Sequence, residues 1–230
     1  MFPVFPILAK SCGPTGGACR RNAPGFGIVA SVEPQSDPIL ALFERTGAYL
    51  RGHFRLTSGL HSPEYLQCAK VLQYPEHAQA LGASLAGRLV ERLGAAKAGL
   101  VAAPALGGLI IGHEVARALG VRFIFTERDA ATGKMTLRRG FAVSPGEVAV
   151  VVEDVITTGG SSREVVQLLE AAGAQVLVAG SIVDRSGGSA DAGVPRLALA
   201  TLKVVAYQPE ECPLCAQGLP VVKPGSRPGA

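Results

Sequence analysis

The sequence predicts an α/β fold, in which helices flank a parallel sheet and a small N-terminal hood precedes it. Two observations support this prediction. First, 48% of the 230 residues are apolar and only 17% are charged, which is enough apolar surface for a complete core. Second, short aliphatic runs alternate with amphipathic helical segments in the second half of the chain, a pattern typical of a parallel sheet covered on both faces.

The N-terminal part of this fold begins with a short amphipathic helix. Asp37 is a capping residue and Pro38 suits the first helical position, so the helix is expected to run from there toward Gly47. Gly and Pro punctuate residues 49–72, which indicates the extended strands and turn of the hood. A long helix over 76–93 follows the hood.

The core is expected to consist of strands that alternate with helices. Strands are predicted over 100–103, 121–126, 148–152, 176–183 and 197–205, and helices over 109–119 and 161–172. Parallel strands bring their carboxyl ends to one edge of the sheet. We therefore expect the ligand site at that edge.

Composition divides the chain into four regions. We expect a mobile tail over 1–35, an N-terminal helix and hood over 36–75, a core over 76–225 and a second tail over 226–230. The first tail is rich in Gly and Pro and sustains no hydrophobic period. Within the core, residues 127–146 are polar and basic and too long for a simple connection, so we expect a flexible loop that contacts a ligand.

Charge and cysteine content argue against several classes of protein. The formal net charge of +4 is mild and the basic residues are dispersed, so nucleic-acid binding is not implied. No run of ~18 apolar residues occurs, so no membrane span is expected. Five cysteines do not suggest a disulfide framework, and the first residues lack a basic leader, which together indicate a reducing cytoplasm.

A protein-held metal ion is not expected. Cys212 and Cys215 have the spacing of half a zinc knuckle, but no second Cys or His pair lies close to them in sequence. The histidines are scattered along the chain at His53, His61, His77 and His113. We therefore interpret the two thiols as structural or incidental.

The segment richest in chemical information follows the strand predicted over 148–152. Glu153 and Asp154 lie at the carboxyl end of that strand, and a turn of Thr and Gly leads into the next helix. The glycines let the backbone approach a ligand, and the N–H groups and hydroxyls at the helix start can donate to phosphate oxygens. The two carboxylates suit sugar hydroxyls or a hydrated Mg²⁺ beside that phosphate.

This segment, Glu153-Asp154-Val155-Ile156-Thr157-Thr158-Gly159-Gly160-Ser161, resembles the phosphoribosyl-pyrophosphate signature of the type I phosphoribosyltransferases, and most closely that of the orotate phosphoribosyltransferase family. Two further stretches agree. Residues 52–63 resemble the hood of that family, and Asp184-Arg185 lies at a strand end where its orotate-contacting arginine is found. The resemblance extends over about residues 37–225.

The resemblance implies a type I phosphoribosyltransferase fold and a reaction. A 5-phosphoribosyl group would pass from phosphoribosyl pyrophosphate to orotate, giving orotidine 5′-monophosphate and pyrophosphate in pyrimidine (UMP) biosynthesis. Mg²⁺ would be required, held mainly through substrate and water. A homodimer would form, in which the basic loop of each subunit enters the neighbouring site.

The resemblance also implies roles for individual residues. Contacts to phosphoribosyl pyrophosphate would come from Glu153, Asp154, Val155, Ile156, Thr157, Thr158, Gly159, Gly160, Ser161, Arg128, Lys134 and Arg138. Contacts to orotate would come from Thr157, Arg185 and Tyr65. Catalytic roles would fall to Asp154, Glu153, Lys134 and Arg128. The two acidic residues would stabilise positive charge on the sugar, and the two basic residues would stabilise the departing pyrophosphate.

The sequence departs from the family pattern at several positions. Thr57 and Gly107 stand where lysines are often found, and Tyr65-Leu66 replaces a pair of phenylalanines. Two alternatives therefore stay open. One is a phosphoribosyltransferase that acts on a purine or another nucleobase, and the other is a non-catalytic regulator that senses phosphoribosyl pyrophosphate.

Overall fold

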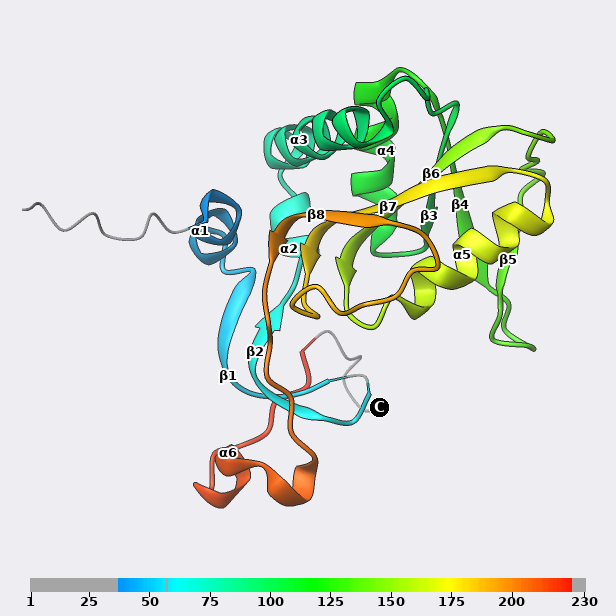
Figure 1. The fold of residues 1–230 in the computed structure, drawn as a ribbon. Helices are drawn as coiled ribbons and strands as arrows, with labels where there is room; N and C mark the ends of the chain where they lie inside the picture. The colour runs from blue at the N-terminus through cyan, green and yellow to red at the C-terminus, as the bar shows by residue number, and fades with distance from the viewer. Residues whose placement is uncertain (1–36, 57, 225–230) are drawn as a thin grey trace, which may run out of the picture. The chain divides into compact units, whose positions relative to one another are not determined.

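The core of the protein is a six-stranded sheet with helices on both faces (Figure 1). The computed structural model describes residues 37–56 and 58–224, so the tails and Thr57 lie outside the described residues. The strands are β3 (Leu100–Pro104), β4 (Arg122–Arg128), β5 (Met135–Leu137), β6 (Val148–Ile156), β7 (Gln175–Asp184) and β8 (Arg196–Thr201). Their order is β5-β4-β3-β6-β7-β8, and all neighbouring pairs are parallel except β4 with β5. The predicted fold class is confirmed.

Different helices cover the two faces of the sheet. Successive side chains along each strand point to opposite faces, so each strand contributes to two clusters. On β6, Val150 and Val152 pack in the cluster that includes α3 (Pro75–Leu93) and α4 (Gly108–Leu119). Ala149 and Val151 face the opposite cluster, which includes α5 (Gly160–Ala171). Both clusters are closed to solvent, so the sheet edge that carries the strand ends rests on a rigid core.

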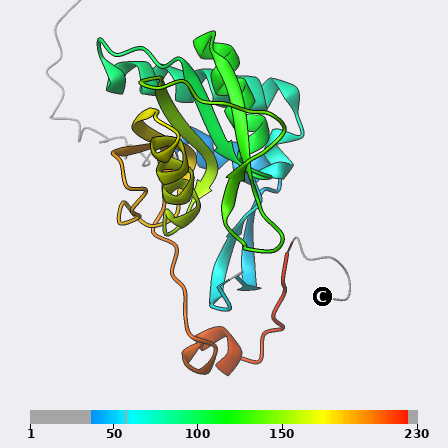
Figure 2. The same ribbon diagram turned by 90° about the vertical axis from the view of Figure 1, so that its right-hand side faces the viewer.

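The hood is an antiparallel hairpin of β1 (Tyr49–Arg55) and β2 (His61–Leu66), between α1 (Pro38–Arg45) and the short α2 (Ala69–Leu72). The chain after β8 returns to this hairpin and forms the 3₁₀ turn Pro209–Glu211 and α6 (Pro213–Ala216) (Figures 1 and 2). Tyr207 pairs with His61 on one strand, and Val222 with Phe54 on the other. The last segment of the region predicted as core, 76–225, therefore pairs with the hood.

The basic loop over 127–146 is partly regular. β4 extends to Arg128, and β5 pairs with it in register Arg128↔Met135. Alternation also buries Met135 in the cluster beneath α5. The start of the predicted loop is therefore an edge hairpin of the core sheet.

None of the helices within the described residues combines the length and apolarity that a membrane crossing requires.

The contact between α3 and α4 depends on a glycine, which gives a stability test. A Cβ added at Gly82 would lie 2.5 Å from the Cβ of Glu114, whereas one added at Gly87 of the same helix would meet no atom within 4 Å. We expect Gly82→Ala to lower the free energy of unfolding by about 1–3 kcal/mol because the helices must move apart. Gly87→Ala should raise it by about 0.5–1 kcal/mol through helix propensity. Urea unfolding of both variants checks this, and equal effects would contradict the close packing.

Candidate active site

A cavity of about 700 Å³ opens at the carboxyl ends of β6 and β7. The hood provides one wall, through Leu56, Ser58, Leu60 and Tyr65. The core provides the other, through Asp154, Val155, Thr157, Thr158, Arg185, Ser186, Ser189 and Ala190. This is the sheet edge at which ligands bind in parallel α/β folds.

Two partly buried carboxylates, Glu153 and Asp154, lie near the end of β6. Burial raises the pKa of Glu153 to about 7, although the Ser162 hydroxyl donates a hydrogen bond to its carboxylate and partly opposes this. Burial also raises the pKa of Asp154, which lines the cavity and accepts a 2.9 Å hydrogen bond from the Val155 N–H. Both carboxylates therefore carry a desolvation cost that a cationic or hydroxyl-bearing ligand could offset.

Gly107 lies against Asp154 from the loop after β3. A Cβ at this position would lie 2.5 Å from Asp154 Oδ1. Any side chain here would displace the carboxylate. The glycine that departs from the family pattern therefore has a steric reason in this chain.

The turn between β6 and α5 is open to an anion. Gly159 caps α5 with φ +89°, and a Cβ there would lie 2.4 Å from the carbonyl oxygen of Asp191. Because this cap is a glycine, no cap side chain accepts from the N–H groups of the first helical turn. The Gly160 N–H donates to the Thr158 hydroxyl oxygen at 3.4 Å. The other N–H groups of this turn and the hydroxyls of Thr157 and Thr158 can donate to phosphate oxygens.

Arg185 follows β7 and reaches the same cavity. Its Nε is buried without a hydrogen-bond partner among the described residues, so an acceptor is missing there. Burial lowers the pKa of Arg185, and the nearby Tyr65 and Glu64 partly offset this. Burial likewise raises the pKa of Tyr65, which lies on the hood wall. The pair offers a planar cation and a half-buried ring to one ligand.

An ion pair between the buried Asp184 and the partly buried Arg196 holds the segment that carries Arg185. Asp184 pairs with Arg196 and accepts hydrogen bonds from the N–H and hydroxyl of Ser186. Arg196 also donates to the carbonyls of Gly188 and Ala190. These contacts fix the loop that forms the cavity floor beside Arg185.

The basic loop surrounds a separate hollow of about 430 Å³. Arg128 and Lys134 line it with Glu164, whose carboxylate pairs with Arg128 at 3.0 Å. Arg138 is exposed, and Arg139 pairs with Glu127 at 2.8 Å. The two hollows share no lining residue, so the structure does not bring the predicted loop residues to the cavity of the same chain.

The structure thus brings together part of the predicted set. Asp154, Val155, Thr157, Thr158, Tyr65 and Arg185 line one cavity. Ile156 does not line it, because its side chain is buried and only 1% exposed. Gly159, Gly160 and Ser161 lie at the start of α5, and Glu153 lies behind Asp154, bonded to Ser162.

Sequence reasoning missed two groups of residues. The cavity wall formed by Val204 and Ala206 comes from the segment that returns to the hood, which no local pattern signals. The interpretation of the histidines as scattered is wrong for two of them, since His53 Nε2 lies 2.9 Å from His61 Nδ1. Pairing of β1 with β2 brings them together.

Comparison with known proteins identifies the family. The family model described as "Phosphoribosyl transferase domain" matches residues 71–193. An orotate phosphoribosyltransferase of Pelotomaculum thermopropionicum is 55% identical over 83% of this chain and 97% of its own length. That of Thermotoga petrophila is 50% identical over 82% and 98%. The crystal structure of orotate phosphoribosyltransferase from Aeropyrum pernix superposes with a TM-score of 0.60 at 28% identity, covering 72% of this chain and 94% of that one. The chain belongs to the orotate phosphoribosyltransferase family.

Proposed function

We propose that this chain transfers the 5-phosphoribosyl group of phosphoribosyl pyrophosphate to a ring nitrogen of orotate, in pyrimidine biosynthesis. The bond from the sugar C1 to the pyrophosphate oxygen breaks, a bond from C1 to the ring nitrogen forms, and the proton of that nitrogen passes to the departing pyrophosphate or to water. The observation that carries this proposal is the single cavity that presents an unpaired buried arginine nitrogen, a carboxylate and a phosphate-binding turn. These groups match the carboxylate of orotate, the ribose hydroxyls and the 5′-phosphate.

The donor would bind along β6 and the start of α5. The turn after β6 would donate to the 5′-phosphate through its N–H groups and hydroxyls. Asp154 would accept from the ribose hydroxyls, and Glu153, held by Ser162, would add negative potential behind it. As C1 loses its leaving group, the sugar ring becomes cationic, and these fixed acids would stabilise it without reorganising.

The acceptor would bind between the hood and the end of β7. Arg185 offers a planar fork whose buried Nε has no other partner among the described residues, and a carboxylate supplies the acceptors that it needs. Tyr65 would cover one side of the ring. A purine base has no carboxylate, so this corner of the cavity does not favour the purine alternative.

The leaving group would be neutralised by the basic loop and by Mg²⁺. Arg128 and Lys134 line a hollow separate from the cavity, so we propose that the loop serves the site of a second subunit in a homodimer. The oxygen donors at Asp154 fit Mg²⁺, and because Oδ1 already accepts from Val155, substrate and water oxygens would supply most ligands. When bound, Mg²⁺ would offset the charge of the pyrophosphate.

The location we propose is the reducing cytoplasm. All three cysteines within the described residues are free thiols, as expected where disulfides are not maintained.

The proposed reaction predicts base specificity. Purified full-length protein with Mg²⁺ and phosphoribosyl pyrophosphate should consume orotate. The loss of the near-ultraviolet absorbance of orotate measures this consumption. Adenine, guanine and hypoxanthine should be poor acceptors because they leave Arg185 unpaired. Turnover of a purine with orotate unchanged would reassign the acceptor, and donor binding without turnover of any base would favour the regulator.

Arg185→Lys tests the orotate contact. Lysine keeps the charge but loses the planar fork, so the KM for orotate should rise about tenfold or more, while the KM for the donor changes little. Arg117→Lys is the matched control, because Arg117 is exposed on α4 and pairs with Glu114. Steady-state kinetics with each substrate varied in turn measure both effects. An unchanged KM for orotate would remove Arg185 from the acceptor site.

The raised pKa of Glu153 predicts a pH-dependent stability. The carboxyl group of Glu153 loses its proton near pH 4.5 in the unfolded chain and near pH 7 in the folded chain. The stability that comes from the tighter proton binding of the folded state is therefore fully present below pH 4.5 and is lost as pH rises to about 7. The lost stability is on the order of 3 kcal/mol. Glu153→Gln should remove this loss, whereas Glu170→Gln, which removes an exposed carboxylate of α5, should keep it. Urea unfolding at pH 5 and pH 8 measures the difference, and parallel pH trends for wild type and Glu153→Gln would contradict it.

A further inference from the structure

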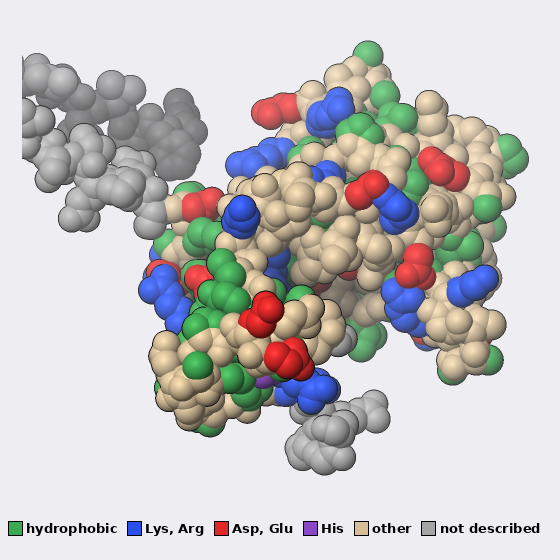
Figure 3. Space-filling model, turned by 60° about the horizontal axis from the view of Figure 1, so that its bottom comes forward, with side chains coloured by type: hydrophobic (Ala, Val, Ile, Leu, Met, Phe, Trp, Pro, Cys, Tyr) green, Lys and Arg blue, Asp and Glu red, His purple; other side chains and the backbone are tan. Residues whose placement is uncertain are grey.

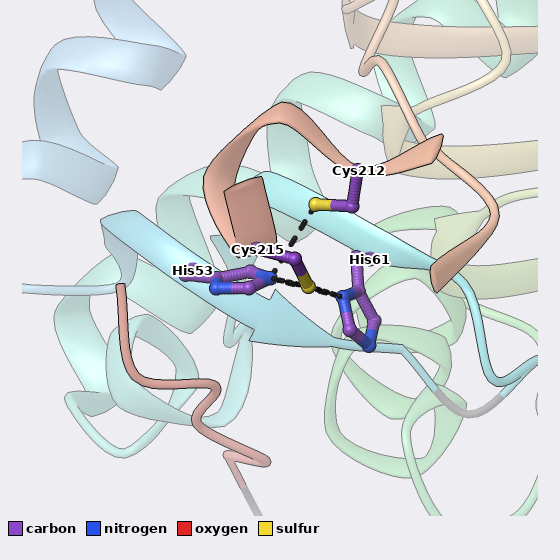
Figure 4. A group of neighbouring side chains, drawn as sticks. All are labelled: His53, His61, Cys212 and Cys215. Carbon is purple, nitrogen blue, oxygen red and sulfur yellow. Dashed lines mark hydrogen bonds between the residues drawn. The ribbon is translucent and has the colours of Figure 1, made fainter. Parts of the chain in front are cut away.

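Four side chains from distant parts of the chain meet at the hood (Figure 4). His53 lies on β1 and His61 on β2, while Cys212 and Cys215 lie around the start of α6. His53 and Cys212 are 159 positions apart in sequence. The hairpin brings the two histidines together, since the Cα partners of His61 and Ser62 are Arg55 and Phe54, and His53 lies in the register shift that precedes Phe54.

The ligand atoms of these four side chains have the spacing of a tetrahedral site. His53 Nε2 lies 2.9 Å from His61 Nδ1, 3.5 Å from Cys212 Sγ and 3.6 Å from Cys215 Sγ. Cys215 Sγ lies 3.2 Å from His61 Nδ1, and all four atoms lie within 4.8 Å of one another. Zinc, with Zn–N of about 2.0 Å and Zn–S of about 2.3 Å, places neighbouring ligand atoms roughly 3.3–3.8 Å apart.

The hydrogen bond of His53 orients it as a ligand. Its Nδ1 lies 2.9 Å from the carbonyl oxygen of Leu219, and a carbonyl can only accept, so Nδ1 carries the proton. In the neutral ring Nε2 then carries the lone pair, and it points at the two thiols and at His61. A metal-binding histidine is commonly held this way by a carbonyl on its other nitrogen.

Burial and charge also suit a metal ion. His53, His61 and Cys212 are 4%, 8% and 3% exposed, and histidine shows only as a small patch on the face in Figure 3. Two thiolates and two neutral imidazoles would balance the charge of a divalent ion, leaving a neutral centre among three buried ligands and the exposed Cys215. A two-iron cluster binds histidines and cysteines on different irons, which requires the two pairs to lie further apart than they do here.

We propose that His53, His61, Cys212 and Cys215 form a structural Zn²⁺ site that fastens the C-terminal segment to the hood. All four coordination positions are filled by protein, so the site is closed and has no position for a substrate. It is chemically distinct from the proposed Mg²⁺ site, which consists of oxygen donors. The soft sulfur and imidazole ligands select zinc over magnesium.

The site lies between two backbone pairings. Tyr207 and His61 exchange hydrogen bonds of 2.8 and 2.9 Å, and on the other strand the N–H of Val222 donates to the carbonyl of His53 at 2.8 Å. The residues between these pairings form the loop that carries both cysteines. Zinc would therefore cross-link three chain segments, and the hood wall of the cavity would depend on it.

Metal content of the untagged full-length protein tests the proposal. After purification with zinc in the growth medium, elemental analysis should find about one zinc ion per chain. Cys212→Ser combined with Cys215→Ser should reduce this at least tenfold. His113→Gln and Cys68→Ser, which remove an exposed imidazole and a thiol outside the cluster, should keep it. Equal zinc loss in both groups of variants would overturn the proposal.

Cobalt substitution of the wild-type chain tests the ligands without depending on how a variant folds. Chelated and reduced protein should take up one equivalent of Co²⁺ and gain the visible absorption of a tetrahedral thiolate site, and Zn²⁺ should displace it. Zinc should also protect two thiols from alkylation and slow hydrogen exchange in residues 49–66 and 203–222 by tenfold or more. None of these readouts requires enzymatic turnover, so they stand apart from the proposed reaction. Protein that contains no zinc as purified and binds no Co²⁺ after reduction would overturn the site.

Discussion

The pairing of β6 with β7 is the constraint on which the site depends. The two strands are parallel, and Ile156 at the end of β6 is the Cα partner of Asp184 at the end of β7. The segments that follow the two strands therefore leave the sheet side by side. The turn after β6 and Arg185 after β7 consequently open into one cavity. The N–H of Arg185 even donates to the carbonyl of Ile156 at 2.8 Å, which ties the two ends together. A shift of either strand by one residue would turn its side chains to the other face and separate these groups.

Local sequence patterns were enough to predict the strands of the core sheet and the turn that follows β6. Aliphatic runs such as 148–152 and the glycine-rich turn after them are contiguous in sequence, and both strand periodicity and capping act over a few residues. The same reasoning predicted Asp154, Thr157 and Thr158 at the cavity. The same contiguous motif also includes Ile156, whose buried side chain does not line the cavity.

The hood could not be predicted to the same extent. Its hairpin carries a recognisable turn, but its partners on both edges come from residues that follow the last core strand. The meeting of His53 with Cys212 depends on that return of the chain and on the register of β1 with β2. Neither constraint leaves a signal in a short window of sequence. The spacing of Cys212 and Cys215 therefore indicated two of the four ligands of the proposed zinc site, and no sequence pattern indicated His53 and His61.

The hairpin also explains why the C-terminal segment is needed. β1 and β2 have seven and six residues, and a two-stranded hairpin of that size is marginal in water. Phe54 gains the backbone partner Val222, and His61 gains Tyr207, so each strand is supported on its outer edge. The same segment supplies Val204 and Ala206 to the cavity wall. The acceptor side of the cavity thus rests on a hairpin that would be marginal by itself, and that hairpin is held by pairings from the far end of the chain.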